Sequence, residues 1–214
     1  MIKYVHNLII LDRSGSMISI REQAVAGINS TLRIIRSSAE ESNIQQYVTL
    51  CSFCSCEMRD TYLDTPIEII KDFRAKDYEP CCCTPLYDAI GRCCTRLEET
   101  ISAKEHPEEH AVSVTIITDG YENDSRKFTS LDISRLIEKL KGNGWLFAFI
   151  GANIDVERVA KEMKIDHSME FIPTPDGTSR MFACEAAARR KWTSNLENVS
   201  SAEDLEELNQ DYFE

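Results

Sequence analysis

Side chains with oxygen atoms that could bind a cation gather in three short stretches of the chain. The first is Asp12-Arg13-Ser14-Gly15-Ser16, the second is Thr84, and the third is Thr118-Asp119-Gly120. Together they offer two carboxylates and three hydroxyls, with no histidine close by in the sequence. Hard cations such as Mg²⁺ and Mn²⁺ prefer oxygen ligands of this kind, whereas Zn²⁺ prefers nitrogen and sulfur. The pattern therefore indicates chemistry based on a hard divalent cation.

Two formal negative charges and five protein groups do not saturate a divalent cation, so some of these groups would act through water. One coordination position would then be taken by solvent or by an anion from outside the chain. We expect Gly15 to allow a tight turn that directs the hydroxyls of Ser14 and Ser16 toward one point.

Each of the three stretches lies next to a predicted strand or helix. The apolar run 4–11 predicts a buried strand that ends at Asp12, and the β-branched run 111–117 predicts a second that ends before Asp119. Thr84 precedes a helical pattern that starts after Pro85, a residue well suited to a first helical turn. Ligands of open α/β sheets bind outside the carboxyl ends of the strands, so we expect these loops to converge.

The remaining pattern alternates between strands and helices. It predicts helices with apolar positions in 25–35, 86–101, 131–140, 156–163 and 179–192, and further strands at 47–53, 58–63, 145–150 and 169–172. The strands at 47–53 and 58–63 are predicted to pair as a hairpin. The fold class is therefore α/β, with a Rossmann-like open, mostly parallel sheet, one antiparallel edge strand and helices on both faces.

The charge distribution suggests one domain, 1–192, followed by an acidic tail, 193–214. The formal net charge is −12, and the stretch 197–214 holds seven carboxylates but no Lys or Arg. An acidic chain is a poor candidate for binding nucleic acid or anionic membrane surfaces. The longest apolar run near the start is much shorter than a membrane span or a secretory signal requires, so we expect a cytosolic protein.

The three loops resemble a known metal site. Asp12-x-Ser14-Gly15-Ser16, Thr84 before a helix, and Thr118-Asp119-Gly120 look like the metal-ion-dependent adhesion site (MIDAS) of a von Willebrand factor A (vWA) domain, most closely of the stand-alone bacterial type. The resemblance covers residues 1–190, and three motifs in the expected order make it far more specific than the first motif alone.

The resemblance implies a role for each residue of the site. Ser14, Ser16 and Thr84 would supply hydroxyl ligands, and Asp12 and Asp119 would bind the ion directly or through water. The ion would be Mg²⁺, with Mn²⁺ or Ca²⁺ as alternatives. An Asp or Glu of a partner protein would complete the octahedron. The chain departs from the family at Cys81-Cys82-Cys83, where smaller, glycine-rich residues are usual.

Simpler interpretations exist for several of these residues. Asp12, Ser14 or Ser16 could cap a helix, but capping explains one oxygen atom and not three. Glu122 and Asp124 follow the third motif and could tune the metal, but we expect them to be solvated.

The nine cysteines allow more than one interpretation. A zinc site made from Cys51, Cys54, Cys56 and Cys81–Cys83 is conceivable, but alternating spacing on a strand disfavours it. The simpler interpretation is small side chains that fill a core, and we expect this for Cys93 and Cys94. A thiol-based redox sensor that uses Cys81–Cys83 is a further alternative.

The functional hypothesis is a non-enzymatic adaptor module that binds a partner protein through the metal ion. The alternative in a different class is a metal-dependent phosphohydrolase, because a strand ending in Asp beside Mg²⁺ also occurs in phosphatases. That alternative lacks a second Asp two residues after Asp12 and a Gly-rich phosphate loop. The sequence leaves the partner and the oligomeric state open.

Overall fold

The computed structural model describes residues 1–213 and contains a six-stranded sheet with the strand order β3-β2-β1-β4-β5-β6. Four of the five strand pairings are parallel, and only β2 and β3 pair antiparallel. The strands are β1 (Tyr4–Asp12), β2 (Gln45–Cys54), β3 (Glu57–Pro66), β4 (His110–Thr118), β5 (Leu146–Gly151) and β6 (His167–Glu170). The predicted fold class, with its antiparallel edge strand, is confirmed.

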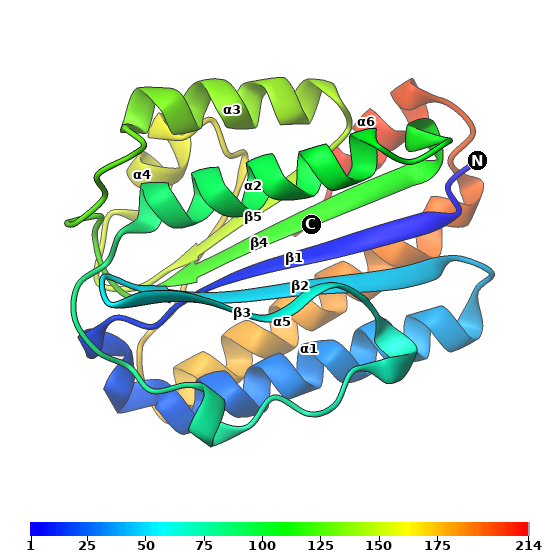
Figure 1. The fold of residues 1–214 in the computed structure, drawn as a ribbon. Helices are drawn as coiled ribbons and strands as arrows, with labels where there is room; N and C mark the ends of the chain where they lie inside the picture. Colours follow the sequence, from blue (N-terminus) through cyan, green and yellow to red (C-terminus); the bar gives the residue numbers. More distant parts are fainter. Residues whose placement is uncertain (214) are drawn as a thin grey trace.

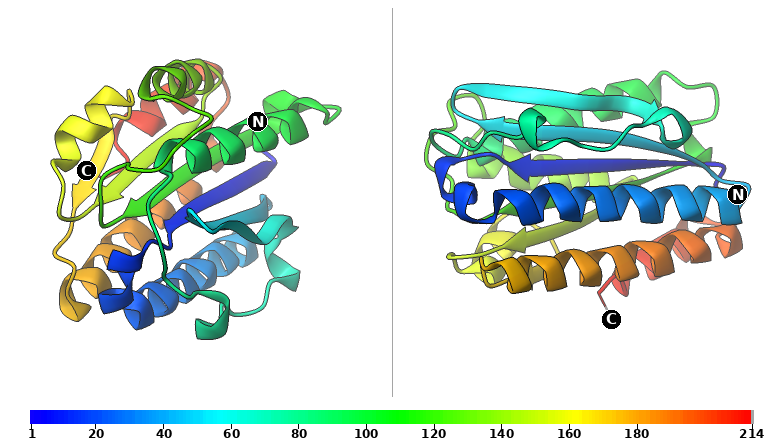
Figure 2. Two further views of the ribbon diagram at one scale, coloured as in Figure 1. Left: turned by 60° about the vertical axis from the view of Figure 1, so that its left-hand side comes forward. Right: turned by 90° about the horizontal axis from the view of Figure 1, so that it is seen from below.

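Helices cover both faces of the sheet, as Figures 1 and 2 show. In the view of Figure 1, α2 and α3 lie above the sheet, and α1 and α5 lie side by side below it. The helices are α1 (Arg21–Glu41), α2 (Leu86–Ser102), α3 (Ser130–Gly142), α4 (Val156–Glu162), α5 (Pro175–Asn195) and α6 (Ala202–Gln210).

The central strands are buried on both faces, so their apolar runs are continuous. Because successive side chains of a strand point to opposite faces, Leu8 and Ile10 of β1 pack under α2 and α3. Ile9 and Leu11 pack against α1 and α5 on the other face. These two cores hold β1 rigidly from both sides and fix where its carboxyl end lies.

Several elements differ from the sequence-based prediction; β2 begins two residues earlier and β3 ends three residues later than expected. A 3-10 helix, Gly15–Ile20, precedes α1, and β6 begins two residues earlier than expected. The last long helix begins at Pro175 rather than Ser179, because the Thr174 side chain accepts a hydrogen bond from the Gly177 N–H and caps the helix there. Proline is well tolerated in that first turn. Further 3-10 helices are Ile67–Ile69, Ala75–Asp77, Pro107–Glu109 and Leu196–Asn198.

The acidic C-terminal segment folds back onto the domain. Ser201 and Asp204 form a capping box at the start of α6, and Leu205 and Tyr212 are buried beside Trp192. The division into a domain at 1–192 and a tail at 193–214 stays a prediction, and Glu214 lies outside the described residues.

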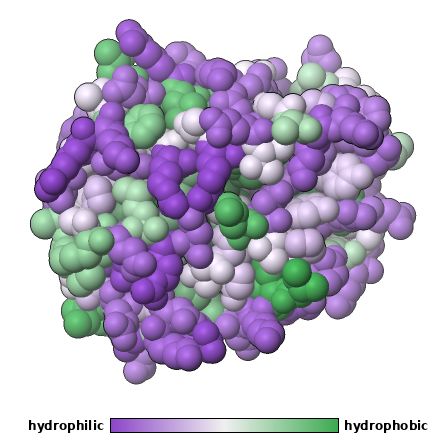
Figure 3. Space-filling view, in the orientation of Figure 1, coloured by the Kyte–Doolittle hydropathy of each residue, from purple (hydrophilic) through white to green (hydrophobic). Residues whose placement is uncertain are grey.

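The surface drawn in Figure 3 is mostly hydrophilic, with small separated apolar groups. Within residues 1–213, no helix is both long enough and apolar enough to cross a bilayer.

Candidate metal centre

The three oxygen-rich loops converge at the carboxyl ends of β1 and β4, at the left-hand edge of the sheet in Figure 1. β1 lies between β2 and β4. The strands that follow β1 in the sequence are therefore added first on one side of β1 and then, from β4 on, on its other side. This point, where the strand order reverses, is where open α/β sheets bind their ligands.

Asp12 is fully buried and held at both carboxylate oxygens. Oδ1 accepts a hydrogen bond from the Ser14 N–H at 2.6 Å, and Oδ2 accepts one from the Thr118 hydroxyl at 2.6 Å. The Tyr78 hydroxyl donates to the Asp12 carbonyl at 2.5 Å. Asp12, the last residue of β1, is therefore held in one position at the base of the site by the first loop and by β4.

The hydroxyls of the first loop lie beside Asp119, the residue after β4. Ser14 Oγ and Ser16 Oγ are 3.1 Å apart, and Ser16 Oγ donates to Asp119 Oδ1 at 2.5 Å. Ser14 is the residue before the 3-10 helix, yet its side chain makes no capping hydrogen bond there. Helix capping therefore does not explain the serines of this loop.

Thr84 joins the same group from the opposite side. A methyl group placed on Gly120 would lie 3.9 Å from Thr84 Oγ1 and 4.0 Å from Ser16 Oγ, so both hydroxyls border the space above Gly120. Thr84 is buried, and its backbone exchanges hydrogen bonds with Asn123: Thr84 N–H donates to Asn123 Oδ1 at 2.8 Å, and Asn123 N–H donates to the Thr84 carbonyl at 3.1 Å.

The expected reason for Gly15 is wrong. Its backbone is not left-handed, and a β-carbon there would make ordinary contacts of 3.6 Å with the Cys82 carbonyl oxygen. The 3-10 helix that starts at Gly15 brings Ser14 and Ser16 together, and a glycine conformation is not required for it.

Burial shapes the electrostatics of the two carboxylates. It raises the pKa of Asp12 to about 6, against hydrogen bonds from Thr118 and Ser14 that favour the ionised form. Burial likewise raises the pKa of Asp119. Within residues 1–213, no Lys or Arg forms an ion pair with either group, since Arg13 turns away to Glu57. The two acids thus lack a compensating positive charge.

Two acids, Glu122 and Asp88, hold the loop after Asp119 in place. Glu122 accepts hydrogen bonds from the N–H groups of Tyr87, Asp124 and Ser125 at 2.7–3.0 Å, so the solvated interpretation is wrong for Glu122. Asp88, in the first turn of α2, accepts from three consecutive N–H groups, those of residues 126–128. These contacts, with Asn123, fix α2 and Thr84 relative to Asp119.

The cysteines divide into two groups. Cys51, Cys54, Cys93 and Cys94 are buried, which confirms the core interpretation for Cys93 and Cys94. Cys56, Cys82, Cys83 and Cys184 are exposed and Cys81 is half-buried, so filling a core does not explain them.

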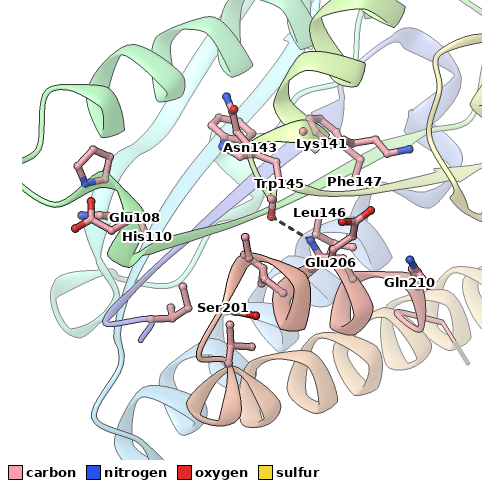
Figure 4. Close-up of a pocket in the computed structure, with 18 of the residues that line it drawn as sticks. Glu108, His110, Lys141, Asn143, Trp145, Leu146, Phe147, Ser201, Glu206 and Gln210 are labelled. Atoms are coloured by element: carbon pink, nitrogen blue, oxygen red, sulfur yellow. Dashed lines mark hydrogen bonds between the residues drawn. The ribbon is translucent and has the colours of Figure 1, made fainter.

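A cavity of about 760 Å³ lies at the opposite end of the sheet. Figure 4 shows its walls, with Trp145, Leu146 and Phe147 facing Ser201, Glu206 and Gln210 of the C-terminal segment. This is the amino end of the parallel strands, where ligands of such sheets do not usually bind, so we place the candidate site at the carboxyl end.

The geometry of the oxygen-rich group fits a small hard cation. Adjacent ligands of octahedral Mg²⁺ lie about 3.0 Å apart, given metal–oxygen bonds of about 2.1 Å. The oxygen spacings of 3.1 Å between Ser14 and Ser16 and 2.5 Å between Ser16 and Asp119 lie on either side of that value. A cation here would also balance the two buried acids.

No protein-family model matches the sequence, and no curated protein sequence matches it. Solved structures do match. The VWA domain of SpRpn10 aligns with a TM-score of 0.57 and 12% identity over 86% of this chain and 95% of that domain.

Two further similar structures contain a metal ion. The manganese-loaded TRAP protein of Plasmodium vivax aligns with a TM-score of 0.55 and 14% identity, over 84% of this chain and 72% of that one. Proximal thread matrix protein 1 from the mussel byssus, with zinc in its MIDAS motif, has a TM-score of 0.60 and 13% identity. That alignment covers 87% of this chain but spans about half (48%) of the mussel protein. At these identities the similarity concerns the fold, and this chain has the fold of a von Willebrand factor A domain.

Proposed function

We propose that this protein is a non-enzymatic binding module that holds a partner protein through a divalent cation, Mg²⁺ in the cell. Asp12, Ser14, Ser16, Thr84 and Asp119 would hold the ion, which supplies a positive charge for an incoming Asp or Glu of the partner. The observation that carries the proposal is that three hydroxyls lie beside two buried acids with which no Lys or Arg of residues 1–213 forms an ion pair. The expected cytosolic location stays a prediction.

The arrangement favours binding over catalysis. Both oxygens of Asp12 already accept hydrogen bonds, so this acid is fixed as a support and is poorly placed to move a proton. The similar structures include the metal-loaded TRAP protein and a mussel protein with an occupied MIDAS, which supports a divalent cation in this fold. Turnover of a generic phosphoester that disappears in Asp12→Asn would contradict the non-enzymatic assignment.

The first test concerns the metal. Mg²⁺ at about 100 times its dissociation constant should stabilise the wild-type protein by about 2.7 kcal/mol over the EDTA-treated protein, measured by denaturant unfolding. Asp119→Ala and the double variant Ser14→Ala/Ser16→Ala should lose this gain. Asp124→Asn, which removes a nearby carboxylate that pairs with Arg126 instead, should keep it. An equal gain in all variants would exclude the site.

The second test concerns the partner. Affinity capture from the native cell with Mg²⁺ should retain a protein that EDTA releases and that Asp119→Ala does not retain. Substituting the acidic residues of that protein one at a time should then identify one Asp or Glu whose loss abolishes binding. A partner that binds equally well in EDTA would contradict the proposed mechanism.

A further inference from the structure

Three thiols, those of Cys54, Cys56 and Cys81, meet beside the candidate metal centre, although they come from two separate segments. Cys54 ends β2 and Cys56 lies in the turn to β3, while Cys81 and Cys82 lie in the loop before α2. Cys54 Sγ is 3.3 Å from Cys81 Sγ, and the sulfur atoms of Cys54, Cys56 and Cys81 all lie within 4.8 Å of one another. Cys82 follows Cys81 directly in the chain and is exposed in the same loop.

Backbone contacts hold this arrangement in place. The Cys81 N–H donates to the Arg13 carbonyl at 2.9 Å, the Gly15 N–H donates to the Cys82 carbonyl at 3.1 Å, and the Ser55 N–H donates to the Cys83 carbonyl at 3.2 Å. Cys82 adopts a φ of +61°, a left-handed conformation that residues with a β-carbon rarely adopt. Its backbone is therefore fixed in an uncommon form at the point where the thiols meet.

Packing does not account for this cluster, because Cys56 and Cys82 are exposed and Cys81 is only half-buried. A tetrahedral zinc ion bound to four cysteines, with zinc–sulfur bonds of about 2.3 Å, requires sulfur atoms about 3.8 Å apart. The Cys54–Cys81 separation of 3.3 Å is slightly shorter than this spacing, and the other two separations among Cys54, Cys56 and Cys81 are at most 4.8 Å. The chain alone thus brings three sulfur atoms close to positions that a tetrahedral ion requires.

We propose that Cys54, Cys56 and Cys81 bind one soft, tetrahedral cation of the zinc class, with the adjacent Cys82 as the fourth ligand and with each thiol releasing its proton on binding. The site is separate from the oxygen-rich centre, since thiolates select soft cations and hydroxyls and carboxylates select hard ones. The ion would join the β2–β3 turn to the loop that leads into Thr84, two residues after Cys82. It would thereby fix the position of Thr84.

Sequence spacing disfavoured such a site because Cys54 and Cys56 alternate on one segment. The structure supplies the missing half from the loop at 81–82, and it also removes Cys51 from the set. Cys51 lies instead with Cys93 and Asp60, where Arg92 and Arg96 already neutralise the acid.

The test uses the full chain purified under reducing conditions, stripped of metal and titrated with Co²⁺ as a probe for zinc. We expect the near-ultraviolet charge-transfer bands of cobalt thiolate and the visible bands of tetrahedral cobalt. Cys54→Ser and Cys81→Ser should lose these bands, and the zinc content should fall at least about tenfold from about one ion per chain. Cys56→Ser tests the same ligand set at an exposed turn, where the substitution leaves the core unchanged.

Two controls separate this site from the rest of the molecule. Cys184→Ser removes an exposed thiol on α5 and should keep the bands. Asp119→Ala should also keep them, because cobalt on oxygen ligands gives no thiolate bands, so failure of the oxygen-rich centre would not imitate failure of this one. Only weak octahedral bands in the wild type, or a Cys54–Cys81 disulfide in protein prepared with zinc, would overturn the proposal.

Discussion

At the scale of single residues, a hydrogen-bonded row of three side chains, those of two histidines and one aspartate, lies across three strands. His6 Nδ1 is 2.6 Å from Asp64 Oδ1, and His6 Nε2 is 2.8 Å from His110 Nδ1. The rings of Tyr4 and Tyr47 stack on His110 and His6. Burial, and then the nearby His6, lower the pKa of His110 to about 4 from its ordinary 6.5. The folded protein therefore holds His110 neutral under mildly acidic conditions.

This shift predicts a loss of stability in acid. Between pH 6.5 and about 4 the unfolded chain takes up a proton on His110 that the folded protein does not. The contribution of His110 is therefore complete above pH 6.5 and is lost as the pH falls through 4. His110→Gln should flatten the fall in unfolding free energy over this range, measured by urea titration at several pH values. The exposed His106→Gln is the control, and an equal slope in both variants would refute this expectation.

At the scale of elements, the close approach of α1 and α5 depends on a residue without a side chain. A β-carbon at Gly27 of α1 would lie 2.0 Å from the ring of Phe182 on α5, which is itself buried. Such an overlap cannot be relieved by a small rotation, because the ring packs between the two helices and the sheet. Gly27 thus sets the distance between α1 and α5, the two helices that pack under β1.

Gly27→Ala should therefore destabilise the protein by about 1–3 kcal/mol through overpacking, despite the better helix propensity of alanine. Urea unfolding followed by circular dichroism measures the effect. Gly142→Ala, at the end of α3, is the matched control because no atom lies within 4 Å of the added carbon. If both variants are equally stable, the helix spacing does not depend on Gly27.

At the scale of the whole molecule, a buried ion pair within α5 is hydrogen-bonded to the centre of the sheet. Arg189 pairs with Glu185 at 2.7 Å, and both side chains are almost fully buried. Arg189 also donates to Asn7 of β1 at 2.5 Å and to Thr115 of β4 at 2.7 Å. The same two strands carry Asp12 and lead to Asp119, so this network fixes the strands that hold the candidate centre.

Removing one partner of the pair leaves the other charge buried without compensation. Arg189→Met should cost about 3–5 kcal/mol of unfolding free energy, and the double variant Arg189→Met/Glu185→Met should recover most of that loss. Arg190→Met removes the neighbouring exposed arginine and should change stability by less than about 1 kcal/mol. A double variant as unstable as Arg189→Met would show that the loss is one of packing rather than of charge.

The sheet and the meeting point of its loops could be predicted because their signals are local. Buried central strands are continuous apolar runs, so β1 and β4 stand out, and each leads to an Asp at its carboxyl end. The rule that ligands bind at that edge then places Asp12 and Asp119 together. The apolar spacing predicts a start of α5 at Ser179, whereas the Thr174 cap starts the helix at Pro175.

The alternation of strands and helices and the donor types at the carboxyl edge could be predicted, because periodicity and residue chemistry are local properties. The support of the loops by Glu122 and Asn123 and the contact of Cys54 with Cys81 became visible only in the folded chain. Those contacts join residues whose distance along the chain carries no information about their distance in space, and the packing of the two cores around β1 fixes them.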